Sequence, residues 1–379
     1  MQNFKIIFTA GIAMFAMFFG SGNLVFPIEL GVETGTSYLP ATIGFIITGV
    51  LVPFIGLYSV MLYDGNRHQY FAPLGERTTF ILTIVMLSLM GPFGVMPRCI
   101  LVAYGAFKAL YPSLPVALFS IVFSGIISLV VWRQNQFVPI VGRVLGPIKF
   151  IIIILIIIAA IMYAPGQITD IPETQPFYTG VLQGYQTMDL PAAFFFSITI
   201  MSYLKNTTAK NQQVLKIGIK SSFIAGSLIA VIYFLFAYLG AHYGSALSDS
   251  NPEEYLANIT DIALGRNATI IFAIMMFFAC LTTAATLCKL FAELLQKDIS
   301  GSKISWHQSV AITIAISFAL SLTGFKAISS FLSVILKNAY PALIAYCLMS
   351  IYAKFRPFNH TKNIFWAIFA YEVITNSIL

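Results

Sequence analysis

Long uncharged apolar runs repeat along the whole chain, and they constrain its fold more than any other feature of the sequence. Hydrophobic residues make up 58% of the chain and charged residues 9%, with a mean hydropathy of +0.86. Soluble globular chains carry roughly 25% charged residues, so this chain has too little polar surface to face water on all sides. The composition excludes soluble, disordered, fibrous and disulfide-stapled classes and predicts an all-α integral membrane protein.

The apolar runs are long enough to cross a bilayer, because a membrane-spanning helix needs roughly 20 residues. They predict about 11 transmembrane helices joined by short loops, with no soluble domain. No small-residue cleavage site follows the first run, so we expect it to be retained as a span. The runs cover residues 5–26, 38–62, 79–107, 114–132, 138–163, 180–203, 216–243, 268–290, 306–324, 328–352 and 361–378.

The distribution of lysine and arginine predicts that the N-terminus is cytoplasmic. With this orientation most basic loop residues face the cytoplasm, and only Lys108, Arg266 and Lys326 fall in outside loops. Such a bias follows the positive-inside rule. The net charge of +7 is spread over short loops and forms no single patch, which argues for a lipid bilayer and against nucleic acid as a partner. The four cysteines lie in apolar runs without paired spacing and are interpreted as buried hydrophobes.

Two of the runs contain stretches that a regular mid-membrane helix would not hold. Residues 18–27 read FFGSGNLVFP, and residues 180–191 read GVLQGYQTMDLP. A broken backbone is tolerated at membrane depth only where it faces protein or a water-filled cavity. The two stretches lie in the first and sixth runs, so they predict a five-plus-five repeat with discontinuous helices 1 and 6 and a transporter site between them. The alternative is close helix packing at small residues.

The eighth run carries a stripe of small and hydroxyl-bearing residues at helical spacing: Ala279, Thr282, Thr283 and Thr286. Threonine hydroxyls joined by backbone carbonyls suit Na⁺, whereas the alternative is hydrogen bonding or packing between helices.

Asp189, Arg98 and Lys337 are ionisable residues at predicted membrane depth, where charges are rare and usually functional. Asp189 follows the second break and could assist ammonium binding, carry a coupling proton or cap a half-helix. Arg98, in the third run, could pair with Asp189 or bind carbonyls of a broken helix. Lys337, in the tenth run, could act as an intracellular gate or extend its ammonium group to the interface.

Several of these runs resemble the branched-chain amino acid:cation symporters, the system II carrier proteins of bacterial inner membranes. The resemblance rests on residues 18–27, the GYQTMD sequence at 184–189 and the ACLTTA sequence at 279–284, with Gly91-Pro92-Phe93 and Pro97-Arg98 in support. It implies the inverted repeat of the leucine-transporter-like superfamily, with repeats at 1–163 and 164–352 and an additional C-terminal helix at 353–379. The family usually has a twelfth helix; we expect its absence to affect oligomerisation or stability more than transport.

The resemblance also implies the roles of individual residues. Amides of the first break would hold the substrate carboxylate, and backbone of the second break would hold its ammonium group. The implied substrate residues are Gly20, Ser21, Gly22, Asn23, Gly184, Tyr185, Gln186 and Thr187. A Na⁺ ion would bind the carbonyls of Ala16, Phe19 and Ala279 and the hydroxyls of Thr282 and Thr283. In some members of the superfamily a nearby lysine replaces this ion; no lysine adjoins Thr282 or Thr283, which favours Na⁺.

The function predicted from these features is secondary active import of leucine, isoleucine and valine, coupled to Na⁺ by alternating access. The alternative is an H⁺-coupled or differently specific small neutral amino acid transporter of the same fold. No nucleophile–base pair, metal cluster or cofactor motif indicates an enzyme, and no G-x-x-x-x-G-K loop indicates an ATP-driven pump. A channel would need a continuous pore, whereas two buried breaks suit an occluded site.

Overall fold

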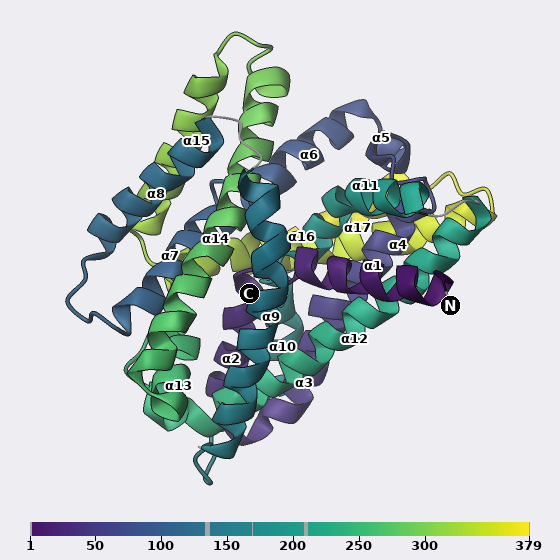
Figure 1. The fold of residues 1–379 in the computed structure, drawn as a ribbon. Helices are drawn as coiled ribbons and strands as arrows, with labels where there is room; N and C mark the ends of the chain where they lie inside the picture. The colour runs from purple at the N-terminus through teal and green to yellow at the C-terminus, as the bar shows by residue number, and fades with distance from the viewer. Residues whose placement is uncertain (1, 133–136, 169, 208–210, 379) are drawn as a thin grey trace.

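The structure, a computed structural model, describes residues 2–132, 137–168, 170–207 and 211–378, and all regular elements of these residues are helical (Figure 1). The first half contains α1 (Gln2–Phe18), α2 (Gly22–Thr34), α3 (Tyr38–Ile46), α4 (Val52–Met61), α5 (Arg67–Phe71), α6 (Glu76–Met90), α7 (Val95–Lys108), α8 (Val116–Trp132) and α9 (Phe137–Met162). The second contains α10 (Pro176–Tyr185), α11 (Asp189–Thr207), α12 (Asn211–Tyr243), α13 (Tyr255–Leu264), α14 (Arg266–Leu294), α15 (Trp306–Ser321), α16 (Phe325–Phe355) and α17 (Thr361–Ile378). Short 3₁₀ or π segments connect or extend some of them: η1 (Gly35–Ser37), η2 (Ile47–Leu51), η3 (Ala72–Leu74), η4 (Gly244–Leu247), η5 (Pro252–Glu254) and η6 (Leu295–Ile299).

These helices include several that are long and apolar enough to cross a membrane, so the predicted fold class is confirmed. Within the described residues, five continuous stretches meet that criterion: Gly22–Met61, Glu76–Lys108, Gln213–Leu247, Arg266–Ile299 and Phe325–Phe355. A sixth is the pair α10 and α11, which is bent by 42°. Each predicted apolar run lies mainly on helix, although the first run is divided between α1 and α2, the third between α6 and α7, and the sixth between α10 and α11.

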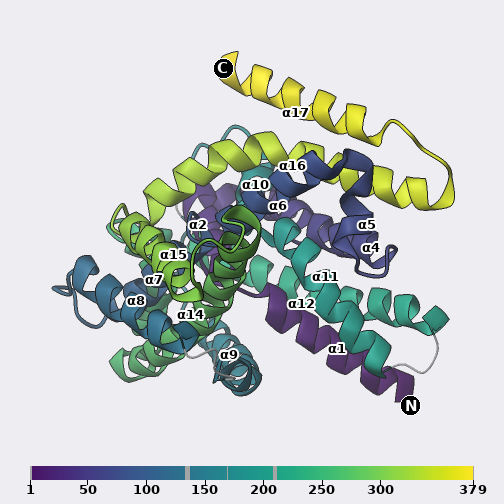
Figure 2. The same ribbon diagram turned by 90° about the horizontal axis from the view of Figure 1, so that it is seen from above.

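The helices form two packed groups that face each other (Figure 1). In one group α2 and α1 pack on α12, α3 packs on α10, and α4 packs on α11. In the other group α7, α8, α14 and α15 pack together. The helix α9 lies against α14 and connects the groups, and α17 lies at the edge of the bundle against α16 (Figure 2).

Glycines allow two helix pairs of the first group to approach at backbone contact. On α2, a Cβ atom at Gly31 would lie 2.0 Å from the carbonyl oxygen of Ala237 on α12. On α10, a Cβ atom at Gly180 would lie 1.8 Å from the carbonyl oxygen of Ala41 on α3. Helix α2 belongs to the first predicted span and α12 to the seventh, whereas α10 belongs to the sixth and α3 to the second. In a five-plus-five repeat, spans 1 and 7 of one contact correspond to spans 6 and 2 of the other. The two glycine contacts are therefore equivalent between the two halves of the chain.

Two helices, α5 and α13, lie between the predicted spans and were not expected. The side chain of Asn66 begins α5 by accepting hydrogen bonds from the amides of His68 and Gln69, at 3.1 and 3.2 Å. Both helices are too short for a hydropathy search, although they bury Tyr70 and Ile259. The interpretation of the cysteines is confirmed, because Cys99, Cys280, Cys288 and Cys347 are free and buried.

Candidate substrate and ion site

The first helix break covers residues 19–21, between α1 and α2. It is shorter than the predicted stretch, because Asn23 and Pro27 already belong to α2. The amide of Gly20 donates to Asn23 Oδ1 at 3.0 Å, whereas the amide of Ser21 has no acceptor within the described part of the chain. The start of α2 therefore leaves backbone donors where an anion could bind.

The second break lies at residues 186–188, between α10 and α11. Met188 has a left-handed backbone with φ of 58°, a conformation that is costly for a residue with a side chain. A hydrogen bond of 3.0 Å from Thr187 Oγ1 to the carbonyl oxygen of Gly184 holds the turn. Sequence reasoning located both breaks correctly, and a Cβ atom at Gly22 would lie 3.7 Å from Thr187 Cα, so the breaks face each other.

A buried group of polar side chains connects the two breaks. Asn23 Nδ2 donates to Asp189 Oδ2 at 2.8 Å, and the hydroxyl of Tyr233 donates to the same oxygen at 3.2 Å. Asn23 also bonds the hydroxyl of Tyr233. Asp189 is the first residue of α11 and only 4% exposed. Among the described residues neither ion pair includes it, since these join Lys108 to Glu254 and Lys205 to Asp64.

Arg98 of α7 binds the second break and does not pair with Asp189. Its Nη1 donates to the carbonyl oxygen of Gln186 at 2.9 Å, and its Nη2 donates to Gln186 Oε1 at 2.6 Å and to Ser329 Oγ at 3.3 Å. The guanidinium also stacks over Phe26, 4.9 Å from the ring centre. Of the two predicted roles, the structure therefore places Arg98 on a carbonyl of the broken helix. This single side chain ties α7 to α2, to the second break and to α16.

The predicted Na⁺ ligands are brought together only in part. Thr282 Oγ1 and Thr283 Oγ1 donate to the carbonyl oxygen of Ala279 at 3.0 and 3.1 Å. The carbonyl oxygen of Phe19 accepts a hydrogen bond of 2.7 Å from Lys149 Nζ on α9. Sequence reasoning counted this lysine among the cytoplasmic basic residues and missed its contact with Phe19, which is 130 residues away along the chain.

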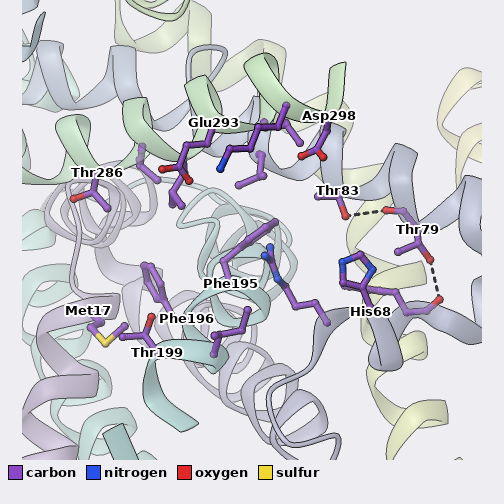
Figure 3. Close-up of a pocket in the computed structure, with 18 of the residues that line it drawn as sticks. Met17, His68, Thr79, Thr83, Phe195, Phe196, Thr199, Thr286, Glu293 and Asp298 are labelled. Atoms are coloured by element: carbon purple, nitrogen blue, oxygen red, sulfur yellow. Dashed lines mark hydrogen bonds between the residues drawn. The ribbon is translucent and has the colours of Figure 1, made fainter. Parts of the chain in front are cut away.

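A cavity of about 1810 Å³ lies beside the C-terminal part of α1, which precedes the first break. Its walls include the inner parts of α1, α11 and α14, and Ala16, Thr282 and Thr283 are among its lining residues. Thr286 and Glu293 lie on the α14 wall, and Phe196 and Thr199 lie on the facing wall (Figure 3). The residues that Arg98 binds do not line this cavity. The residues of the two breaks do not line the cavity, and Ser21, Gln186 and Met188 are buried, so the breaks are largely enclosed by protein.

Lys337 is not part of this arrangement. It is half-buried on α16, forms no hydrogen bond or ion pair with the described side chains, and does not line the cavity. In contrast, Tyr233 and Ser329 contact the breaks, although nothing in their sequence neighbourhood distinguished them.

Comparison with known proteins identifies the family. The model of the branched-chain amino acid transport protein family matches residues 3–377. The chain belongs to this family. Branched-chain amino acid transport proteins are permeases and not enzymes, so the chain is a branched-chain amino acid carrier with several membrane spans.

Curated members of the branched-chain amino acid transport protein family match most of the chain. The branched-chain amino acid permease BrnQ of Bacillus subtilis is 31% identical over 332 residues, which cover 83% of this chain and 75% of that protein. BraB of the same organism is 29% identical, covering 91% and 79%. BrnQ of Corynebacterium glutamicum is 28% identical, covering 92% and 81%.

Solved structures confirm that this family member has the leucine-transporter-like fold. The inward-facing conformation of Mhp1 matches with a TM-score of 0.70 at 11% identity, covering 91% of this chain and 76% of that chain. MhsT in complex with L-phenylalanine matches with a TM-score of 0.59 at 15% identity, covering 95% and 97%.

Proposed function

We propose that the chain imports leucine, isoleucine and valine across a bacterial inner membrane by alternating access, driven by the inward flow of a cation. The observation that carries the proposal is the pair of helix breaks, which face each other at a buried position. Arg98 and its partners enclose the second break, and a cavity lies next to the end of α1, at Ala16 and Met17, close to the first break. A carrier must present its site to one side at a time, whereas a channel needs a continuous path.

The orientation and the division into repeats are part of this proposal. Arg67 and Lys297 line the cavity and belong to the basic loops, which supports a cytoplasmic opening and a cytoplasmic N-terminus. The glycine contacts that exchange between halves support inverted repeats at 1–163 and 164–352. The remaining segment, 353–379, is the additional helix.

The substrate occupies the space between the breaks in this proposal. Its carboxylate takes the free amide of Ser21 and the neighbouring amides at the start of α2, where the helix dipole favours an anion. Its ammonium group takes the carbonyl oxygen of Tyr185 beside the second break, because Arg98 already occupies that of Gln186. One methylene changes binding by only about 1–3 kcal/mol, so one apolar pocket accepts all three side chains.

For the coupling cation, Na⁺ is the ion predicted from the sequence and H⁺ is the alternative. Asp189 supports H⁺ as a specific candidate. The carboxylate lies between the two breaks, and its hydrogen-bond partners are the neutral side chains of Asn23 and Tyr233. An ionised carboxylate without a cation partner is costly in an apolar interior, so this group is suited to binding a proton during the cycle.

Replacing Asp189 by asparagine tests this candidate. The D189N carrier is expected to lose accumulation driven by a proton gradient by at least about tenfold, equal to 1.4 kcal/mol, while still exchanging leucine between equal pools. Uptake by the unmodified chain is expected to rise as the outside pH falls, because protonation from outside would load the site. Asp261→Asn is the matched control, since Asp261 accepts a hydroxyl bond from Thr269 on the distant α13–α14 pair. Equal proton-driven accumulation by D189N and the unmodified chain would contradict the role.

Uptake of labelled leucine into proteoliposomes tests the function as a whole. Inward gradients of Na⁺, of H⁺ and of neither ion are compared at matched ionic strength. Accumulation under either gradient that unlabelled isoleucine and valine compete away is expected. No uptake and no exchange under any gradient would contradict branched-chain amino acid import.

A further inference from the structure

The segment that connects α12 to α14 contains η5 and α13, and it lies at the end of the bundle opposite the cavity. The cavity borders the C-terminal part of α14, from Thr282 to Leu294, whereas α13 directly precedes the first residue of α14 (Figure 1). With 29 residues, α14 is about 44 Å long, so the two features are separated by most of the bundle. We call residues 252–264 the outer lid.

The outer lid is docked on α7 at backbone contact. A Cβ atom at Gly105 of α7 would lie 2.3 Å from the carbonyl oxygen of Glu253 and 3.1 Å from its Cγ atom. The next residue, Glu254, forms an ion pair of 3.0 Å with Lys108 and accepts a hydrogen bond of 2.8 Å from Asn251. The segment η5 also packs on α2 and α16. The lid therefore contacts three helices that reach the breaks at their other residues.

Docking of the lid encloses a carboxyl group that has no partner. Glu253 is 9% exposed, and its Oε2 atom is buried without a hydrogen-bond donor among the described residues. Neither ion pair of these residues includes it, whereas the equally buried Glu254 has Lys108 as its partner. An ionised carboxylate is costly where it is cut off from water and from donors, so burial favours the protonated form of Glu253.

The groups around Glu253 agree with this preference. Burial raises the pKa of Glu253 from its ordinary value of 4.5 to about 7; Glu254 raises the pKa as well, whereas the backbone amide of Glu253 and two lysines lower it. Of these lysines, Lys108 is bonded to Glu254, and Lys326 is exposed to water. The titratable groups that face Glu253 are Glu254 on the lid itself, Tyr255 on α13, Tyr104 and Lys108 on α7, Glu29 on α2 and Lys326 on α16.

We propose that Glu253 is a proton-binding site of the outer lid: docking of the lid on α7 takes up one proton from the water on that side, and opening of the lid returns it there. One O–H bond forms at the carboxylate, and no other bond changes. Because the open lid exposes the carboxylate to water, where it ionises readily, docking and protonation are coupled. Protons on the lid side thus favour the closing step of import, but this proton is not transported. Only the assignment of that side to the cell exterior rests on the proposed function.

Labelling of a cysteine placed on the lid tests this coupling in the purified full-length protein. Ala257→Cys introduces a thiol at a position of α13 that is 1% exposed, and the native cysteines are buried. The rate of reaction with a maleimide is compared with that of the Ala257→Cys, Glu253→Gln protein at the same pH, which cancels the effect of pH on the thiol. Glutamine has the shape of the protonated acid but does not ionise. The rate ratio is expected to rise at least about tenfold from about pH 5.5 to about pH 7.5, since one pKa unit corresponds to tenfold.

The melting temperature as a function of pH tests the coupling without the added cysteine. Because folding raises the pKa of Glu253, its contribution to stability is present below pH 4.5 and is lost as the pH rises through about 7. The unmodified chain is therefore expected to lose melting temperature over this interval relative to Glu253→Gln. Asp249→Asn, at an exposed position of the same loop, is the matched control and should follow the unmodified chain.

The neighbouring carboxylate provides a second contrast. Glu254→Gln removes the ion pair with Lys108, so it is expected to raise the labelling rate at every pH and to leave the pH dependence unchanged. An unmodified chain and a Glu253→Gln protein with the same pH dependence of melting would overturn the proposal, even if the Ala257→Cys proteins did not fold. Neither measurement uses an amino acid, so a failure of the import function would leave the proton site standing.

Discussion

Replacing Gly180 by alanine is expected to prevent formation of the folded carrier. The added Cβ atom would lie 1.8 Å from the carbonyl oxygen of Ala41 and 2.7 Å from its carbon, and neither backbone atom can rotate away. Overpacking of a dense interior costs about 1–3 kcal/mol or more, and here α3 and α10 would have to separate. The yield of monodisperse protein after detergent extraction and its melting temperature measure the effect. Gly31→Ala is expected to behave alike, because its Cβ atom would lie 2.0 Å from the Ala237 oxygen.

Gly125→Ala provides the control for these substitutions. Gly125 is on α8, and a Cβ atom there would meet no atom within 4 Å. Alanine favours a helix over glycine by roughly 1 kcal/mol, so the yield should equal or exceed that of the unmodified chain. A Gly180→Ala protein that elutes and melts like the Gly125→Ala protein would show that the α3–α10 contact can relax.

Replacing Arg98 by methionine is expected to abolish net uptake while leaving a folded protein. The change removes donors to the backbone and side chain of Gln186 and to Ser329, which hold the buried second break against α7 and α16. Hydrogen bonds to charged groups contribute about 1.5–3 kcal/mol each, so losing even one reduces the population with the second break held in this way roughly tenfold or more. Uptake of labelled leucine into proteoliposomes is the measurement, with a melting curve to verify folding. Arg98→Lys is expected to retain part of the activity, because lysine keeps the positive charge but lacks the two-nitrogen guanidinium that bonds Gln186 and Ser329 together.

Arg266→Met is the matched control for Arg98. Arg266 also donates to a backbone carbonyl, that of Leu110 at 3.1 Å, but it lies at the start of α14 and away from both breaks. Its uptake should stay within about twofold of the unmodified chain. Normal uptake by Arg98→Met would mean that the arrangement of the second break does not depend on this side chain.

The sequence was sufficient to locate both helix breaks, because glycine and proline act on the backbone within a few residues of their own position. It overestimated the first break, since α2 continues through Pro27. It also placed the threonine stripe on one helix face, which follows from spacing alone. Hydropathy identified the spanning segments but missed α5 and α13, whose apolar residues are too few for a span-length window.

The contacts that give the site its charge could not be predicted in this way. Lys149 is 130 residues from Phe19, Arg98 is 88 residues from Gln186, and Tyr233 is 44 residues from Asp189. Periodicity indicates the face on which a side chain lies, but not the helix that it meets. The choice of partner depends on how the two helix groups pack, and this information is spread over every interface.

The position of Asn23 has a consequence for the thermodynamics of the cycle. Its side-chain oxygen accepts from the Gly20 amide in the first break, and its nitrogen donates to Asp189 at the second. The side-chain amide of Asn23 therefore contacts both the first break and Asp189, and its orientation depends on both partners. If protonation of Asp189 changes the affinity for the amino acid by some factor, binding of the amino acid must change the proton affinity of Asp189 by the same factor. This follows from reciprocal linkage.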